Sequence, residues 1–282
     1  MRTSKRAWSR SLLASFLALG GIGSVACDAG GGGGGMQGAG NIPANLARFE
    51  QRGPFMTQTF QQGAFSFFVP TASGPDQQFP VATWGNGTAT NPQSYNAFLT
   101  HIASHGIIVV AANSSNVGTG TLLRQGLDQV EQLNGQQGSR LFQRSNGRAC
   151  SIGYSQGGGG AVNAAGDPRV SCSVPIAPDI IFTSRATGNG LSRIFFLGGG
   201  SDNVAPVGPN AQVLFNQASA PKTLSVLAGA NHFEVLGDGG DFKGYATAFL
   251  VAQLRDDLVA ASLFVGANTI AQDPRYTTQQ QN

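Results

Sequence analysis

The middle of the chain carries the stretch Gly153-Tyr154-Ser155-Gln156-Gly157. The apolar run 149–153 predicts a strand before Ser155, and the small residues of 156–165 predict a helix after it. A serine at such a junction stands on a sharp turn, and glycine on both sides leaves room for the strand and the helix to pass. The alternative is an ordinary serine in a glycine-rich loop, but the G-x-S-x-G pattern in this setting predicts a nucleophile.

On both sides of this stretch, short apolar runs alternate with segments of helical period from about residue 63 onward. This alternation predicts an α/β fold: a mostly parallel central sheet flanked by helices on both faces, which is a three-layer sandwich. We see no insertion between the strand after the serine and Asp202 that would form a large lid. The expected strands are 63–71, 79–84, 106–112, 149–153, 170–176, 193–197 and 222–227. The expected helices are 92–105, 119–133, 156–165 and 242–264.

A serine hydroxyl needs a nearby base, and histidine, with an ordinary pKa of about 6.5, is the usual base near neutral pH. Of the three histidines, His232 stands in the loop 228–233, directly after an expected strand. His101 and His105 lie four residues apart on an expected helix, as metal ligands can, but no third ligand accompanies them. We therefore expect His232 to be the base, the other two to be structural, and no metal site.

The acid that orients such a histidine should lie between the serine and the histidine in chain order, on a loop after a strand. Asp202 fits, because it follows the apolar run 194–197 and a turn of small residues. Asp179, after the preceding strand, is the alternative acid. Asp238 and Asp241 come after the histidine, in the wrong order.

A developing oxyanion needs main-chain N–H donors beside the nucleophile. One donor should be the amide of Gln156, at the positive end of the helix that follows the serine. The second should come from the loop after the strand 79–84, where Asn86 stands between two glycines. We therefore expect Asn86 and Gln156 to form the oxyanion site through their backbones.

The composition excludes some classes of protein. The net charge is +3, but the basic residues are scattered, whereas nucleic-acid binding needs them gathered on one face. Hydrophobic residues make up 41% of the chain and charged residues 11%, which is typical of a globular protein with a sizeable core. We expect one domain over residues 46–271, a frayed polar tail over 272–282, a monomer, and no cofactor.

The N-terminus has a positive start, an apolar run and small residues before Cys27, which match an export signal over residues 1–26. The segment also resembles a bacterial lipoprotein signal, in which Cys27 is lipidated and the glycine-rich segment 27–45 is a flexible tether. The protein is then secreted or lipid-anchored in the bacterial cell envelope. In that oxidising compartment, Cys150 and Cys172 form a disulfide or remain two buried thiols.

Residues 65–264, which contain these motifs, resemble the α/β-hydrolase superfamily. Within it they are similar to the polyester hydrolases and cutinase-like enzymes related to dienelactone hydrolases. The resemblance implies the α/β-hydrolase fold and an ester hydrolase in which Ser155, Asp202 and His232 have the roles assigned above. It rests on the stretches 103–110, 153–159, 201–207 and 229–232.

The sequence departs from this family at substrate-facing positions. Poly(ethylene terephthalate) hydrolases usually carry a Trp just after the strand that follows the serine, where this chain reads Pro175-Ile176-Ala177-Pro178-Asp179. Asn86 stands where an aromatic is common. The C-terminal cysteine pair of many such enzymes is also absent. Trp84, Tyr154 and Asp179 are the candidate substrate-binding residues. Alternatively, Trp84 belongs to the core and Tyr154 packs beneath the serine turn.

The expected function is a serine carboxylic ester hydrolase that acts through an acyl-enzyme on short-chain or polymeric esters. One alternative is a catalytically inactive protein of the same fold that binds at a surface, which the intact serine, aspartate and histidine argue against. Others are a peptidase, a lipase for long acyl chains, and an acetyl or feruloyl esterase. Fold alone does not fix the substrate.

Overall fold

The computed structural model describes residues 41–181, 191 and 193–281. The predicted export signal with Cys27 and most of the predicted tether lie outside the described residues, as does part of the stretch before Asp202 in which we expected no lid. Within the described residues, no helix is both long and apolar enough to cross a membrane.

The described residues form a nine-stranded sheet in the order β1-β2-β4-β3-β5-β6-β7-β8-β9. The six strands from β4 to β8 in this order are parallel, whereas β1, β2 and β9 join antiparallel. The predicted mostly parallel sheet is therefore confirmed. The strands are β1 Thr57–Gln62, β2 Phe65–Pro70, β3 Phe79–Gly85, β4 Ile108–Ala112, β5 Ser145–Tyr154, β6 Val170–Ile176, β7 Arg193–Gly199, β8 Lys222–Leu227 and β9 Tyr276–Gln281.

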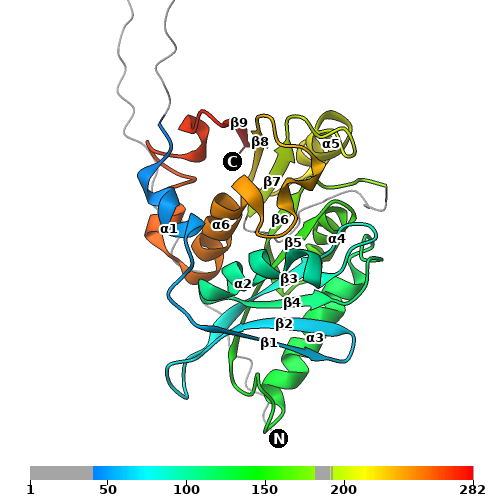
Figure 1. The fold of residues 1–282 in the computed structure, drawn as a ribbon, viewed down its shortest axis with the longest axis vertical. Coiled ribbons are helices and arrows are strands. Elements are labelled where there is room, and N and C mark those ends of the chain that lie inside the picture. The colour runs from blue at the N-terminus through cyan, green and yellow to red at the C-terminus, as the bar shows by residue number, and fades with distance from the viewer. Residues whose placement is uncertain (1–40, 182–190, 192, 282) are drawn as a thin grey trace, which may run out of the picture. The chain divides into compact units, whose positions relative to one another are not determined.

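Helices cover both faces of the sheet, as Figure 1 shows, with α1, α2 and α6 on one side and α3, α4 and α5 on the other. Each strand serves both layers, because successive side chains point to opposite faces. In β7, for example, Phe195 and Leu197 join one hydrophobic cluster, and Ile194 and Phe196 join the other. The α-helices are α1 Ala47–Glu50, α2 Asn96–Ser104, α3 Thr121–Gly135, α4 Gln156–Ala164, α5 Val213–Gln217, α6 Lys243–Arg255 and α7 Leu258–Ala261.

Short helical turns complete the connections between these elements. In the described part of the chain, five are 3₁₀ turns: Ala44–Leu46, Pro92–Tyr95, His232–Val235, Gly240–Phe242 and Ile270–Gln272. One is a π-helical turn, Gly208–Gln212, which leads directly into α5.

Two residues mark the ends of the helix expected over 92–105, and one other helix is shorter than expected. Asn91 caps the turn before α2 by accepting a hydrogen bond from the N–H of Gln93, and Gly106 follows α2 with a φ of 82°. The single helix expected over 242–264 is interrupted. Asp256 adopts a left-handed φ of 54°, and the Asp257 carboxylate then caps α7.

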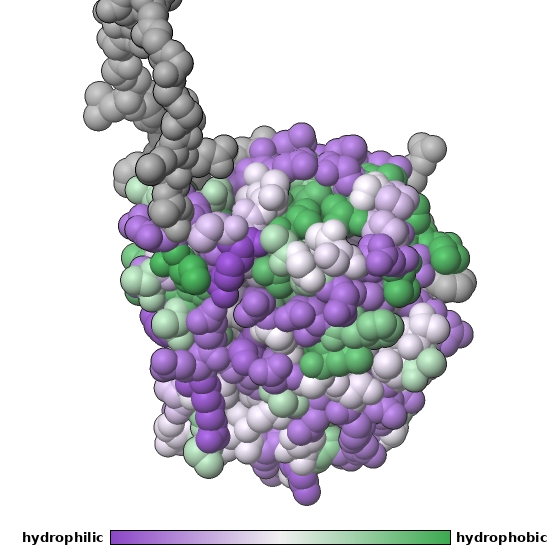
Figure 2. All heavy atoms as spheres, turned by 45° about the horizontal axis from the view of Figure 1, so that its top comes forward, coloured by the Kyte–Doolittle hydropathy of each residue, from purple (hydrophilic) through white to green (hydrophobic). Residues whose placement is uncertain are grey.

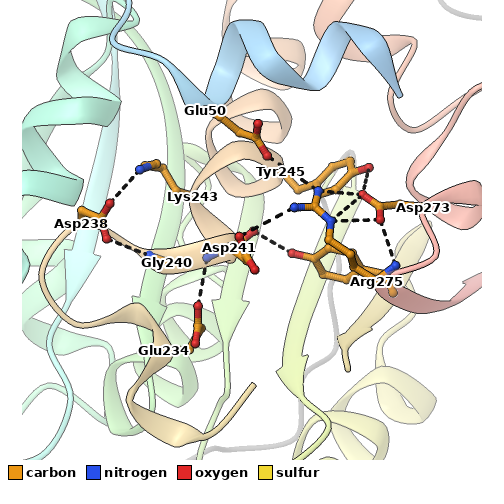
Figure 3. A network of polar contacts seen from close by, with 10 residues as sticks. Glu50, Glu234, Asp238, Gly240, Asp241, Lys243, Tyr245, Asp273 and Arg275 are labelled. Atoms are coloured by element: carbon orange, nitrogen blue, oxygen red, sulfur yellow. Dashed lines mark hydrogen bonds and ion pairs between the residues drawn. The ribbon is translucent and has the colours of Figure 1, made fainter. Parts of the chain in front are cut away.

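The C-terminal residues form a strand, which corrects the expectation of a frayed tail. β9 pairs with β8 along its whole length, so the ladder uses main-chain groups and tolerates polar side chains. Just before it, the buried Asp273 carboxylate binds the Arg275 guanidinium and the Tyr245 hydroxyl. Figure 3 shows how this network also reaches Asp241.

The two cysteines of the sheet form a disulfide. Cys150 on β5 and Cys172 on β6 are register partners in neighbouring strands, with a Cα–Cα distance of 4.7 Å that suits a disulfide. Both residues are fully buried. Of the two alternatives that the sequence left open, the structure contains the disulfide.

Candidate active site

The serine turn lies between β5 and α4, and its backbone is strained. Ser155 has φ 55° and ψ −122°, a left-handed conformation that residues other than glycine rarely adopt. A Cβ at Gly153 would collide with the main chain of Gly157, and a Cβ at Gly157 would collide with the main chain of Gly85. The two glycines therefore allow β5, α4 and the end of β3 to pass closely, as the sequence pattern predicts.

Ser155, His232 and Asp202 lie in one hydrogen-bonded chain. The Ser155 Oγ is 3.0 Å from His232 Nε2, and His232 Nδ1 is 2.7 Å from Asp202 Oδ2. All three residues are buried, with exposed fractions of 7%, 5% and 5%. With the Nδ1–H donating to the carboxylate, Nε2 has a lone pair free to accept the serine proton.

The carboxylate of Asp202 is fixed by main-chain donors as well. Its Oδ1 accepts from the N–H groups of Val204 at 2.9 Å and Ala205 at 2.8 Å, while Oδ2 faces the imidazole. We call residues 200–207, which follow β7, the acid loop. Two N–H donors on one oxygen hold the other oxygen toward the histidine, so the acid loop itself sets the direction of the carboxylate.

His232 begins a 3₁₀ turn after β8, in a segment that we call the base loop, residues 228–242. The side chain of Asn231 caps this turn by accepting from the N–H of Phe233 at 2.8 Å. The Tyr154 hydroxyl donates to the main-chain carbonyl of His232 at 2.6 Å. The base is therefore held at its carbonyl as well as at its ring.

Asn86 is held firmly in the segment that we call the oxyanion loop, residues 84–90. Its side chain is fully buried, accepts from the Trp84 indole N–H at 2.9 Å, and donates to the carbonyls of Ala112 at 2.7 Å and Ser114 at 2.8 Å. This side chain is thus committed to structure, so the residue can serve as an oxyanion donor only through its backbone, as expected.

Gln156 shows the same division between side chain and backbone. Its side-chain oxygen accepts from the N–H of Val117 at 3.1 Å, and the residue itself opens α4 beside Ser155. The positive end of the helix therefore lies next to the nucleophile, where it favours negative charge.

The three candidate substrate-binding residues lie in different places. Trp84 is fully buried and packs against Tyr95 and Phe98, so it belongs to the core. Tyr154 is 3% exposed, and its ring packs against the rings of Tyr95 and His232. Neither ring is presented to a ligand, which matches the alternative that the sequence left open for both.

Asp179 differs from the two aromatic candidates. Its N–H donates to the carbonyl of Ser155 at 3.0 Å, and its carboxylate accepts from the N–H of Ile181 at 2.8 Å. It therefore lies beside the nucleophile without being the partner of His232. The alternative acid is not the one that the structure brings to the imidazole.

The other two histidines bind carbonyls of the N-terminal segment. His101 Nε2 is 2.8 Å from Phe49 O, and His105 Nε2 is 3.0 Å from Gln51 O. Burial lowers the pKa of both, that of His105 to about 4. Within the described part of the chain, no group of three or more His, Cys, Asp or Glu side chains could hold a metal ion.

Sequence reasoning missed three exposed apolar residues next to the site. Phe233 follows the base and is 60% exposed, Val204 lies in the acid loop and is 63% exposed, and Ile181 follows Asp179 and is 76% exposed. An apolar residue one or two positions after each polar candidate was the available signal. Figure 2 shows, on the face it displays, hydrophobic residues gathered into separate patches among polar ones.

The fold and the serine turn together define the class of protein. A mostly parallel sheet, with a serine on a strained turn between β5 and α4 and with the order serine, aspartate, histidine along the chain, is the α/β-hydrolase architecture. The PET hydrolase-like family model matches residues 36–276, so the chain belongs to this α/β-hydrolase-type family of polyester hydrolases. No curated protein matches the chain.

Proposed function

We propose that the protein is a serine carboxylic ester hydrolase in which Ser155 is the nucleophile, His232 the general base and Asp202 the orienting acid. The observation that carries the proposal is the hydrogen-bonded chain of 3.0 Å and 2.7 Å that joins these three side chains. Membership of the PET hydrolase-like family supports ester hydrolysis as the reaction.

The geometry supports acyl transfer in two steps. Ser155 Oγ attacks the ester carbonyl as His232 Nε2 takes its proton, and the tetrahedral oxyanion is stabilised by the main-chain N–H groups of Asn86 and Gln156. Collapse breaks the carbon–oxygen bond of the ester, and the imidazolium returns the proton to the departing alcohol. Water, activated by His232, then attacks the acyl-enzyme and releases the acid and free serine.

We propose that the substrates are short-chain esters and accessible esters of polymers. Three exposed apolar residues, Phe233, Val204 and Ile181, offer apolar contact one or two positions after polar residues of the site. The resemblance implies aromatic side chains at position 86 and in the stretch 175–179, and this chain has none there. Apolar contacts without an aromatic clamp favour flexible acyl chains over stacked aromatic ones. We also propose that the enzyme is a monomer and is exported, either secreted or lipid-anchored through Cys27.

The test is hydrolysis of p-nitrophenyl esters from acetate to palmitate by the protein and its Ser155→Ala variant. We expect fastest turnover of short chains, and a fall in kcat on the order of 10⁶-fold in the variant. Ser201→Ala, which changes an exposed serine of the acid loop, is the matched control and should retain activity.

The other outcomes point to the other candidate functions. A preference for palmitate would favour a lipase. If neither the protein nor the control hydrolyses any ester, the proposal is wrong and a catalytically inactive binding protein is favoured.

A further inference from the structure

The residue just before the nucleophile contacts the base. The Tyr154 hydroxyl donates to the carbonyl of His232 at 2.6 Å, and the centroids of the two rings lie 5.0 Å apart. Tyr154 is 3% exposed, so water does not compete for this hydrogen bond. Burial raises the pKa of the Tyr154 phenol, which keeps the hydroxyl a proton donor across the working pH range.

The same ring supports the oxyanion loop. A Cβ at Gly87 would lie 2.8 Å from Tyr154 Cε1 and 3.0 Å from the hydroxyl oxygen of Tyr95. The main chain of Gly87, one residue after the expected donor Asn86, therefore rests directly on both tyrosines. A larger residue at Gly87 would push the loop off this support.

Tyr95 holds the oxyanion loop by hydrogen bonds. Its hydroxyl oxygen accepts from the N–H of Gly87 at 3.1 Å and lies 2.7 Å from the Thr90 hydroxyl, which in turn donates to Gly87 O at 2.7 Å. The rings of Tyr95 and Tyr154 meet edge to face, with centroids 5.9 Å apart. Both rings are buried, so the pair forms one rigid unit between the oxyanion loop and the base loop.

We propose that Tyr154 and Tyr95 are positioning residues that fix the base and the oxyanion donor relative to Ser155. The inference rests on the proposed function, because it assigns these residues to the same reaction. Tyr154 is covalently next to the nucleophile, bonded to the carbonyl of the base, and in contact with the oxyanion loop. It thereby joins the three parts that must stay in register within a fraction of an ångström.

The test measures kcat, KM and thermal stability of Tyr154→Phe and Tyr95→Phe on p-nitrophenyl butyrate. Each variant keeps its ring and loses one hydroxyl. We expect kcat to fall about tenfold in each, with KM changed less than twofold, because the ester still binds but the reacting groups are less well placed. In the double variant, the two losses should not multiply, since both act on one unit.

The matched control is Tyr276→Phe. The Tyr276 hydroxyl donates to the carbonyl of Asp241 at 2.8 Å, so this variant removes the same kind of hydrogen bond at the far end of the base loop. It should lower Tm as Tyr154→Phe does but leave kcat within twofold. Thr90→Val, which removes the partner of Tyr95 without changing either ring, should reproduce part of the kcat loss.

Three results would overturn the inference. If Tyr154→Phe and Tyr276→Phe lower Tm alike and neither changes kcat, Tyr154 is only structural. If KM rises while kcat is unchanged, the tyrosine acts on binding. Both results leave the proposed function intact, whereas absence of Ser155-dependent hydrolysis in the unmodified protein would overturn the proposed function and this inference together.

Discussion

Two aspartates, Asp202 and Asp273, each have a side chain with no exposed surface, but they have different partners. Asp202 faces the imidazole of His232, which takes up and returns a proton in the proposed reaction. Asp273 binds the guanidinium of Arg275, which stays charged at every accessible pH. The comparison teaches that a buried carboxylate serves chemistry or structure according to whether its partner can change charge.

The electrostatics around Asp273 explain how it stays charged. Burial alone would raise its pKa, but the Arg275 guanidinium, the Arg275 main-chain N–H and the Tyr245 hydroxyl together lower the pKa below its usual value. Arg275 extends the network to Asp241 and Glu50, at 3.7 Å each (Figure 3). The C-terminal segment is thus tied to the base loop and to α1.

The largest effect should come from Asp202→Asn. The amide oxygen can still accept from the N–H groups of Val204 and Ala205, so stability should change little. The amide nitrogen cannot accept the Nδ1–H of His232, so the imidazole takes the wrong tautomer. We expect kcat to fall about 10⁴-fold with Tm nearly unchanged, measured by ester hydrolysis and thermal unfolding.

The control is Asp179→Asn, which alters the alternative acid beside the nucleophile. Its carboxylate caps the N–H of Ile181, a hydrogen bond that the amide oxygen retains. Most activity should remain. If Asp179→Asn lowers kcat more than Asp202→Asn does, Asp179 rather than Asp202 is the acid that orients His232.

Asp273→Asn should have the second-largest effect, and it should lower stability rather than activity. This change leaves the Arg275 guanidinium without its buried counter-ion, and its other partners are weaker because they lie at 3.7 Å and are partly exposed. We expect the free energy of unfolding to fall by about 3–5 kcal/mol, with kcat within about twofold. Urea unfolding and ester hydrolysis measure the two quantities.

Asp241→Asn removes a second, exposed ion-pair partner of Arg275. The Asp241 side chain is 59% exposed, so solvent screens the ion pair and the loss should be under about 1 kcal/mol. If Asp273→Asn lowers kcat as strongly as Asp202→Asn does, the division between chemistry and structure is wrong.

The sequence predicted the core of the fold because its signals are local. Buried parallel strands are continuous apolar runs, and the serine turn is set by two glycines within five residues. Chain order and a position after a strand were enough to find the residues that meet at the site, since parallel strands end at the same edge of the sheet.

The missed parts depend on contacts distant in sequence. β1 and β9 carry mostly Thr and Gln, and only their partners, β2 and β8, make them strands. The break at Asp256 interrupts an apolar period that has no Gly or Pro to mark it. The contact of Tyr154 with the His232 carbonyl joins residues 78 positions apart, which no local pattern encodes.

The last effect should appear at acid pH and involves a third buried group, His105. Its imidazole is 4% exposed, its Nε2 binds Gln51 O, and no carboxylate among the described residues pairs with it. Its pKa is lowered to about 4, chiefly by burial and also by the nearby charges of His101, Arg48 and Arg255, while the hydrogen bond to the carbonyl of Gln51 opposes part of this shift. The folded protein therefore favours the neutral ring.

The sign of the pH effect follows from the lowered pKa. The unfolded chain takes up a proton on His105 near pH 6.5, whereas the folded protein does so only near pH 4. The stabilisation is complete above pH 6.5 and is lost as pH falls to about 4, a total of about 3 kcal/mol. Urea unfolding of the protein and of His105→Gln at pH 7 and pH 4.5 measures it.

This experiment separates the contribution of His105, which is buried and neutral, from that of Asp273, which is buried and charged. His105→Gln should lose less stability on acidification than the unmodified protein does, because the amide does not titrate and its N–H can still donate to Gln51 O. Asp273 should contribute little over this range, since its lowered pKa keeps it ionised until more acid pH. If both proteins lose the same stability between pH 7 and pH 4.5, His105 is not the acid-sensitive group, and the remaining loss belongs to His101 or to the carboxylates.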